Sequence, residues 1–460
     1  MQTDVAVIGA GPGGYVCAIR CAQLGFKVAL IEEGAVGGVC LNWGCVPTKA
    51  LFSATKLVAK AQRAGMMGIE FSSPRIDLSA LAVWKQGIVS RLVGGIEALL
   101  KSNGVTLVEG KGRLDGTGRV ALSTGGTIEA DRVVLATGSS PMEIPGFSFS
   151  DPNVWSSDDA LSLAEIPDRL LVIGGGVIGL ELATIYNRLG SEVAVIEMMP
   201  EILPGIGLDR RSLTILKRAL SAQKIIVHAN TAASSIDESV GGVVVQTNGE
   251  RAFEADRVLL AIGRRPRPEG IGLETVGIAP DRRGFVPVDR ELKTTAAGVY
   301  AIGDLIGGPM LAHKASAEGV KLAAFFAGER MSLDYDAIPQ AIFTDPEVAC
   351  VGLSETRAKQ TGRDIVTGRF PYAALGKALG MGEAEGFFQV VADAESHRLL
   401  GAQIVGAEAS DLISEAAIAV QTGLSVDAIA DAVHPHPTLP EGLKEAAENA
   451  LGRAIHTANR

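Results

Sequence analysis

The pattern of hydrophobic and polar positions repeats within the chain. Residues 4–33 read DVAVIGAGPGGYVCAIRCAQLGFKVALIEE, and residues 169–198 read RLLVIGGGVIGLELATIYNRLGSEVAVIEM. Each stretch has a short apolar run, a glycine-rich turn, a segment of helical pattern, a Leu-Gly stop and a second apolar run. Short apolar runs bounded by turn residues are typical of buried parallel strands. The pattern therefore predicts a strand–helix–strand unit at each place, within an α/β fold.

Both units carry the glycine spacing GxGxxG after the first strand and an acidic residue 23 positions after the first glycine. The first glycine makes a tight turn, the second lets the backbone approach a pyrophosphate, and the third lets helix pack close to strand. The acid can accept hydrogen bonds from ribose hydroxyls. These residues are Gly9, Gly11, Gly14 and Glu32 in the first unit and Gly174, Gly176, Gly179 and Glu197 in the second. Two nucleotide sites in one chain suggest two cofactors that exchange electrons.

A second repeat supports the first. IEADRVVLATG at 128–138 matches FEADRVLLAIG at 253–263, and each follows a turn-rich stretch that predicts a small β-meander, at 105–127 and 225–252. The chain therefore contains two copies of one dinucleotide-binding module, with Rossmann-like strand order expected in each.

Two cysteines lie five positions apart in GGVCLNWGCVPTKAL, residues 37–51. Zinc ligands usually come as closer pairs with a second pair elsewhere, which Cys17, Cys21 and Cys350 do not supply, so a metal site is disfavoured. A structural disulfide across so short a loop would add little stability to a large domain. These arguments leave a reversible dithiol of Cys40 and Cys45, whereas Cys17 and Cys21 are interpreted as small core residues of the first helix.

Composition narrows the class of protein. The 460 residues are 47% hydrophobic and 20% charged, and the formal net charge is −10. This balance, without a long basic run, argues against nucleic-acid binding. No apolar stretch approaches the roughly 18 residues of a membrane span, and the N-terminus has no basic signal region. Five cysteines in so long a chain suggest a reducing compartment, so we expect a cytoplasmic protein.

The paired modules and the dithiol segment together resemble the flavin-dependent pyridine-nucleotide disulfide oxidoreductases, over essentially the whole chain. The resemblance implies that the first module binds FAD, that the second binds the nicotinamide cofactor, and that a C-terminal α+β domain forms a homodimer. The implied domains are 1–145 and 266–333 for FAD, 146–265 for NAD and 334–460 for dimerisation.

The resemblance also assigns roles around the dithiol. Cys45 would lie nearer the flavin, and Cys40 would exchange with the substrate. Lys49 would lie beside the flavin and pair with Glu181. Such a cation would also depress the pKa of a neighbouring thiol.

The segment HPHPTLPE, residues 434–441, resembles the acid/base segment of the family. The resemblance makes His436 the acid/base and Glu441 the carboxylate that orients it. His434 is interpreted as structural. In the family this pair reaches the disulfide of the other subunit, so a homodimer follows.

The remaining cofactor residues also come from the resemblance. YAIGDLIGGPMLAHKASAEG, residues 300–319, would contribute Asp304 to the flavin site and point a helix beginning near Met310 at the flavin. Gly112 and Ala312 are further FAD-site residues, and Glu181 and Gly263 are assigned to the NAD site.

Glu197 would repel a 2′-phosphate, and no arginine follows it, which favours NAD over NADP. Family members that oxidise dihydrolipoamide for 2-oxoacid dehydrogenase complexes are then the best match, and a lipoyl-bearing acyltransferase is the expected partner. Another small disulfide or a quinone as substrate, and a protein that chiefly docks on a multienzyme core, are the alternatives. Trp43, where the family usually has a small β-branched residue, has no assigned role.

Overall fold

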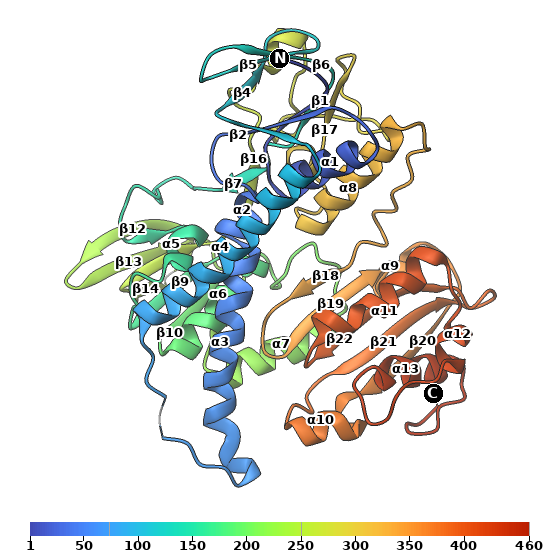
Figure 1. Ribbon diagram of the computed structural model, residues 1–460. Helices are drawn as coiled ribbons and strands as arrows, with labels where there is room; N and C mark the ends of the chain where they lie inside the picture. The colour runs from blue at the N-terminus through green and yellow to red at the C-terminus, as the bar shows by residue number, and fades with distance from the viewer. Residues whose placement is uncertain (73, 250, 460) are drawn as a thin grey trace.

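The computed structural model describes residues 1–72, 74–249 and 251–459 (Figure 1). The N-terminal sheet has the order β3-β2-β1-β6-β5-β4, and β17, far along the chain, pairs with β6. Its strands are β1 (Gln2–Ile8), β2 (Val28–Glu32), β3 (Thr106–Glu109), β4 (Gly112–Leu114), β5 (Arg119–Leu122), β6 (Thr127–Leu135) and β17 (Val299–Ala301). The strands β1, β2, β3, β6 and β17 are parallel, and buried apolar side chains of β1, β2, β6 and β17 form hydrophobic cores on both faces of this sheet. Helices α1 (Pro12–Gln23) and α8 (Ala312–Phe326) run side by side against it.

The second parallel sheet repeats this plan with the order β11-β10-β9-β15-β8. Its strands are β8 (Val154–Trp155), β9 (Arg169–Ile173), β10 (Glu192–Ile196), β11 (Ile226–His228) and β15 (Arg257–Leu260), and its helices are α5 (Ser157–Ser162), α6 (Val177–Leu189) and α7 (Arg210–Ala222). A separate antiparallel sheet contains β12 (Ala233–Ser239), β13 (Gly242–Thr247) and β14 (Ala252–Ala255).

The two predicted meanders are only partly correct. Each turn-rich stretch begins with a strand that extends the parallel sheet instead: β3 pairs with β2, and β11 pairs with β10. The β-branched runs at 105–108 and 225–227 favour a strand, and both strands lie at the edge of their sheet, where Val105 and Ile225 are buried and Ile226 is exposed. The meanders proper are β4-β5-β6 and β12-β13-β14.

The C-terminal unit has an antiparallel sheet of order β18-β19-β22-β21-β20, with helices packed on it. Its strands are β18 (Gln340–Ile342), β19 (Glu347–Gly352), β20 (Ile365–Pro371), β21 (Phe387–Asp393) and β22 (Leu399–Gly406), and its helices are α9 (Glu355–Gln360), α10 (Gly376–Met381), α11 (Ala409–Thr422), α12 (Val426–Asp431) and α13 (Glu441–Ala450). This is the α+β arrangement expected for the C-terminal domain, and the α/β prediction for the rest is also confirmed.

Short elements join the three units. The antiparallel pair β7 (Ser139–Pro141) and β16 (Arg264–Pro266) links the two modules at matching positions of the second repeat. Helix α2 (Gly38–Asn42) leads into α3 (Cys45–Arg63), which runs past α6 toward the C-terminal unit, and α4 (Leu78–Ser102) lies over α3. The 3-10 turns are η1 (Ala64–Met67), η2 (Leu273–Val276), η3 (Gly303–Ile306) and η4 (Tyr372–Ala374). None of the helices in the described ranges is long and apolar enough to cross a membrane.

Candidate active site

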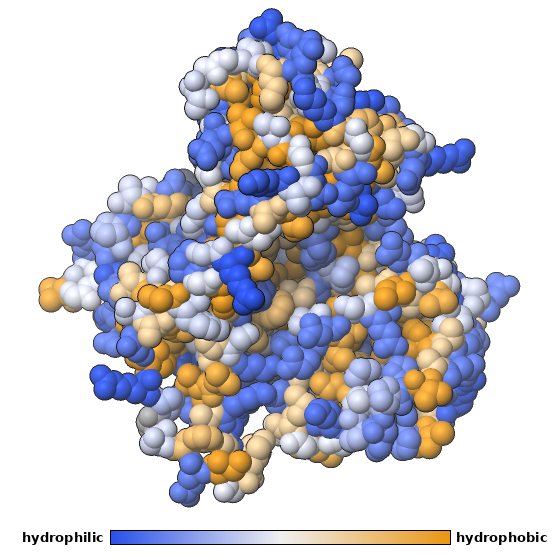
Figure 2. All heavy atoms as spheres, viewed as in Figure 1, coloured by the Kyte–Doolittle hydropathy of each residue, from blue (hydrophilic) through white to orange (hydrophobic). Residues whose placement is uncertain are grey.

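A cavity of about 2120 Å³ lies where the three units meet. Both glycine-rich turns, the start of α3 and the strand β18 line it. The space-filling view shows the same region as a shaded hollow between the upper and lower parts of the molecule (Figure 2). Because both modules open into one cavity, groups bound to each can approach one another there.

The first glycine turn has one open position and two crowded ones. A Cβ atom on Gly9 would lie 2.4 Å from the carbonyl oxygen of Ala136, and the residue has φ +102°. A Cβ atom on Gly14 would lie 1.8 Å from the carbonyl oxygen of Gly9, whereas one on Gly11 would meet nothing within 4 Å. Gly11 and the N-terminus of α1 face the cavity, so this turn has room and free N–H groups for a pyrophosphate.

The second glycine turn repeats this geometry. A Cβ atom on Gly174 would lie 2.4 Å from the Ala261 carbonyl oxygen, and one on Gly179 would lie 2.1 Å from that of Gly174. Gly176 is again open and lines the cavity. Gly14 and Gly179 do not line the cavity; they set the packing of helix against strand, which is the reason for a third glycine.

The two acidic residues hold the glycine turns. Glu32 Oε2 accepts a hydrogen bond of 2.6 Å from the backbone N–H of Ala10, and Glu197 Oε2 accepts one of 2.7 Å from that of Gly175. Each carboxylate also accepts a hydrogen bond from the backbone N–H two residues later in the chain, that of Gly34 or Met199. Both acids line the cavity beside their turns. The open glycine, the helix N-terminus and the acid together fit a dinucleotide in each module.

The two cysteines of the dithiol segment lie on two neighbouring helices, Cys40 in the middle of α2 and Cys45 at the start of α3. Cys40 is half-buried in α2, and Cys45 is the exposed first residue of α3, where helix N–H groups are free. The hydrogen bond from Cys40, and then Lys49, lower the pKa of Cys45 to about 7. The hydrogen bond to Cys45, and then burial, raise the pKa of Cys40 well above its ordinary value. Near neutral pH Cys45 is therefore partly ionised to the thiolate, whereas Cys40 keeps its proton.

Lys49 and Glu181 form an ion pair between α3 and α6. The Lys49 Nζ atom lies 2.8 and 3.0 Å from the two carboxylate oxygens of Glu181, whose side chain is 4% exposed. The backbone N–H of Phe343 donates to the same carboxylate at 3.0 Å, and the Lys49 ammonium lies 4.4 Å from the centre of the Phe343 ring. This pair therefore joins all three units beside the cysteines. No sequence signal indicated Phe343, because its contact depends on the docking of the C-terminal unit.

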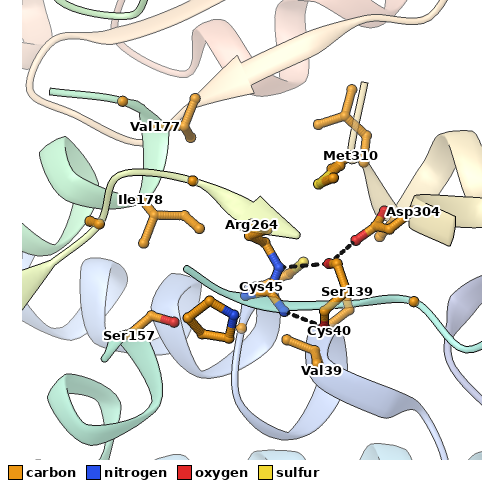
Figure 3. Close-up of a pocket in the computed structure, with 18 of the residues that line it drawn as sticks. Val39, Cys40, Cys45, Ser139, Ser157, Val177, Ile178, Arg264, Asp304 and Met310 are labelled. Atoms are coloured by element: carbon orange, nitrogen blue, oxygen red, sulfur yellow. Dashed lines mark hydrogen bonds between the residues drawn. The ribbon is translucent and has the colours of Figure 1, made fainter. Parts of the chain in front are cut away.

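Asp304 lies at the end of a hydrogen-bonded chain (Figure 3). The Arg264 Nε donates to Ser139 Oγ at 2.8 Å, and the Ser139 hydroxyl donates to Asp304 Oδ2. A second Arg264 nitrogen donates to the Ser139 carbonyl oxygen at 2.8 Å. Sequence reasoning missed Arg264 and Ser139, although both directly follow the glycine that ends the second repeat, in β16 and β7.

The other expected cofactor residues also line the cavity. Gly112 in β4 lies over Ile31, Ala312 is the first residue of α8, and Gly263 precedes β16 with φ +131°. Trp43, which lies between the two cysteines in the sequence, also lines the cavity and is 42% exposed.

His436 and Glu441 meet each other but not the cysteines of their own chain. The His436 Nδ1 lies 2.9 Å from Glu441 Oε1, and the Thr438 N–H donates to the other oxygen at 2.7 Å. The His436 side chain is 79% exposed. Neither residue is among those that line the cavity within the described chain. His434 is largely buried and hydrogen-bonded to Glu415 at 3.0 Å, which fits a structural residue.

Known proteins match the whole chain. The family described as pyridine nucleotide-disulphide oxidoreductase matches residues 3–319, and its dimerisation domain matches residues 338–447. Curated proteins named dihydrolipoyl dehydrogenase are 46% identical in Halobacterium salinarum, over 100% of this chain and 98% of that protein, and 44% identical in Bacillus subtilis, over 99% and 98%.

Among solved structures, LpdA from Mycobacterium tuberculosis is similar, with a TM-score of 0.91 and 29% identity over 97% of this chain and 99% of that one. The HOCl-induced flavoprotein disulfide reductase RclA from Escherichia coli is also similar, with a TM-score of 0.87 and 26% identity over the same shares.

Proposed function

The chain belongs to the pyridine nucleotide-disulphide oxidoreductase family, and from that premise we propose that it is an FAD- and NAD-dependent dihydrolipoyl dehydrogenase. Full-length relatives of that name support this substrate. The observation that carries the proposal is the position of the Cys40–Cys45 pair, in one cavity with both glycine turns. A dithiol placed between two nucleotide sites can receive electrons from a substrate dithiol and pass them on.

The dithiol exchanges with the substrate through Cys40. In the oxidised enzyme Cys40 and Cys45 form a disulfide, and a thiolate of dihydrolipoamide attacks the Cys40 sulfur. The bond between the cysteines breaks, and the electron pair leaves on the Cys45 sulfur. The second substrate thiolate then attacks the substrate sulfur bound to Cys40, which closes cyclic lipoamide and releases Cys40.

The pKa order of the two thiols suits this sequence. A thiol with a lower pKa leaves faster, and Cys45, with a pKa of about 7, is the leaving group of the first step. Because the pKa of Cys40 is raised, Cys40 keeps the proton of the reduced pair. When bound, FAD would supply the electron acceptor for the dithiol, and NAD would supply the hydride acceptor. Gly11, Glu32 and Asp304 would hold FAD, and Gly176 and Glu197 would hold NAD.

Substrate thiols need a base, and within the described residues His436 does not line the cavity that holds the cysteines of its own chain. His436 has an oriented imidazole, because Glu441 accepts from its Nδ1–H and leaves Nε2 as the acceptor. The family match includes a dimerisation domain, so the protein is a homodimer. We place the His436–Glu441 pair of one copy at the cysteines of the other, where Nε2 takes one of the two protons that the substrate loses; the other proton ends on the released Cys40 sulfur.

Three further assignments belong to the same proposal. The lipoyl group is carried by an acyltransferase of a 2-oxoacid dehydrogenase complex. The protein acts in the cytoplasm. The domain limits are those of the sequence prediction, in which residues 266–333 belong to the FAD domain. The pairing of β17 with β6 in the N-terminal sheet supports this assignment.

The test is NADH formation by purified, FAD-loaded dimer given dihydrolipoamide and NAD, with NADP in parallel and Cys45→Ser as the matched inactive protein. We expect rapid turnover with NAD, little with NADP and none in the variant. No turnover with dihydrolipoamide, in protein that still oxidises NADH with another small disulfide, would reject this substrate while keeping the dithiol chemistry. Full activity of Cys45→Ser would reject the mechanism.

A further inference from the structure

A second cavity, of about 310 Å³, lies where α3, the ends of α6 and α7 and the C-terminal unit meet. Among the described residues it shares no lining residue with the large cavity that holds the dithiol. Its volume is at the lower end of the range of ligand pockets, about 300–1,000 Å³, and well above the roughly 30 Å³ that one water molecule occupies. The cavity is therefore separate from the dithiol site and large enough for a small molecule.

Arg188, in the last turn of α6, lines this cavity with a charged group. Its side chain is 4% exposed, and its Nη2 atom donates to Asp345 Oδ2 at 2.8 Å. Its Cζ atom lies 4.7 Å from the centre of the Phe52 ring, which packs against the guanidinium. The Nε and Nη1 atoms are buried and have no hydrogen-bond partner among the described residues. Because buried polar groups are nearly always paired, these N–H groups point to an acceptor supplied from outside the chain.

Glu383, between α10 and β21, brings the opposite charge to the same cavity. Its side chain is 12% exposed, and its Oε1 atom accepts no hydrogen bond from the described residues, although the Lys60 ammonium lies 3.2 Å away. Burial lowers the pKa of Arg188, whereas Asp345 and Glu383 oppose that shift, so Glu383 is close enough to act on the guanidinium. One small cavity thus contains an unused donor and an unused acceptor.

The other charged side chains of the cavity already have partners. They form ion pairs, which are Lys56 with Glu347, Arg63 with Asp345, and Glu385 with Arg218. A ligand with a net charge would disturb this balanced set, because a buried charge without a partner is costly. The rest of the wall includes the apolar side chains of Phe52, Ala219, Ala222 and Ala407. The lining therefore fits a neutral ligand that has a donor, an acceptor and an apolar part.

We propose that this cavity binds a small free α-amino acid with an aliphatic side chain. Its carboxylate accepts from the unpartnered N–H groups of Arg188, its ammonium group donates to Glu383, and its side chain packs on the apolar wall. A zwitterion supplies both the acceptor and the donor without adding net charge. The proposal goes beyond the oxidoreductase activity and does not depend on the identity of the disulfide substrate.

The position of the cavity connects it to the dithiol site. Arg188 lies about two helical turns beyond Glu181 on α6, and Phe52 lies about one turn beyond Lys49 on α3. The Phe52 ring also packs edge-to-face on Phe343, with 5.8 Å between the ring centres, beside the same ion pair. A bound amino acid joins α6 to the C-terminal unit through Arg188 and Glu383. Its binding should therefore raise the unfolding temperature of the dimer.

Titration calorimetry of the purified, flavin-loaded dimer with L-valine tests the proposal. We expect a Kd of about 0.1–1 mM, which suits a ligand of so few atoms, and a higher Tm at saturating valine. Isovalerate, which lacks the ammonium group, and isobutylamine, which lacks the carboxylate, should bind more weakly by a factor of about ten or more. Absence of binding at about 50 mM valine, well above the expected Kd, would mean that the cavity holds only water and would overturn the proposal. Equally tight binding of isovalerate would make this a simple anion site and would also overturn it.

Two variants locate the ligand. Arg188→Met removes the unpartnered N–H groups but keeps an apolar side chain against Phe52, and Glu383→Gln removes the carboxylate charge at nearly constant size. We expect each to raise the Kd for valine by a factor of about ten or more, whereas Arg283→Lys, at an exposed arginine that does not line the cavity, should leave it unchanged. If Arg188→Met does not give a flavin-loaded dimer, Glu383→Gln carries the test alone. Unchanged valine affinity in Glu383→Gln overturns the proposal. None of these readouts uses dihydrolipoamide, so a failed activity assay would not affect them.

Discussion

Replacing Gly14 with alanine should destabilise the first module, whereas the same replacement at Gly11 should leave its stability nearly unchanged. The two glycines belong to one turn and differ in what surrounds them. An added Cβ atom lies 1.8 Å from the Gly9 carbonyl oxygen at position 14 and has nothing within 4 Å at position 11. Gly11 has φ −68°, which alanine also adopts freely.

The size of the effect follows from that contact. Carbon and oxygen normally approach no closer than about 3.2 Å, so α1 must move outward by more than ~1 Å to admit the methyl group of Gly14→Ala. Overpacking against backbone costs up to about 3 kcal/mol, and the better helix propensity of alanine returns up to about 1 kcal/mol. The net loss of about 2 kcal/mol corresponds to a fall in Tm of roughly 4–8 °C for a domain of this size.

The assay is thermal unfolding of flavin-free protein, combined with FAD titration. Gly14→Ala should unfold at lower temperature and bind FAD weakly because the turn has moved. Gly11→Ala should keep its Tm within about 1–2 °C, yet bind FAD at least tenfold more weakly, because its methyl group enters the space of the phosphates. A Gly14→Ala protein as stable as the parent would refute the packing argument, and unchanged FAD affinity in Gly11→Ala would refute the phosphate site.

Three other predictions concern the dithiol, the base and the nicotinamide site. The rate of alkylation of Cys45 in the reduced protein should increase with pH around a midpoint of about 7, because only the thiolate reacts. Lys49→Met should move this midpoint upward, because the variant loses the ammonium group that lowers the pKa of Cys45. The same midpoint in both proteins would contradict the role of the ammonium group. An equal mixture of His436→Gln and Cys45→Ser chains, reassorted at random into dimers, should recover about a quarter of parent turnover, measured as NADH formation, if the base acts across the dimer, and none if it acts within one chain. Glu197→Ser should raise the ratio of NADP to NAD turnover, because the carboxylate that repels a 2′-phosphate is removed. It should also raise the KM for NAD, because the carboxylate accepts a hydrogen bond from the backbone N–H of Gly175 in the glycine turn. An unchanged turnover ratio would contradict the role of Glu197 in cofactor choice.

Local spacing in the sequence determined the nucleotide turns. Gly9, Gly11 and Gly14 lie within six residues, and the crowding that selects glycine involves atoms of the same turn and the adjacent strand. The same physical restraint acts on the second module, so the repeat alone predicted both. The extra parallel strands β3 and β11 were missed because pairing with a distant strand, and not local pattern, placed them.

Contacts between units were decided by the tertiary structure. Glu181 lies in α6, Lys49 in α3 and Phe343 just after β18, and only packing of the three units brings them together. Arg264 reaches Asp304 through Ser139 because β16 pairs with β7, which the sequence repeat does not reveal.

The sequence by itself determined the fold class, the two nucleotide-binding turns and the reversible dithiol, because each depends on residues close together in the chain. Only the tertiary structure decided that the pKa of Cys45 is lowered while that of Cys40 is raised, and that His436 does not line the cavity of its own chain's cysteines. Electrostatic environment and surface exposure depend on residues far apart in sequence, and they are fixed only when the units pack.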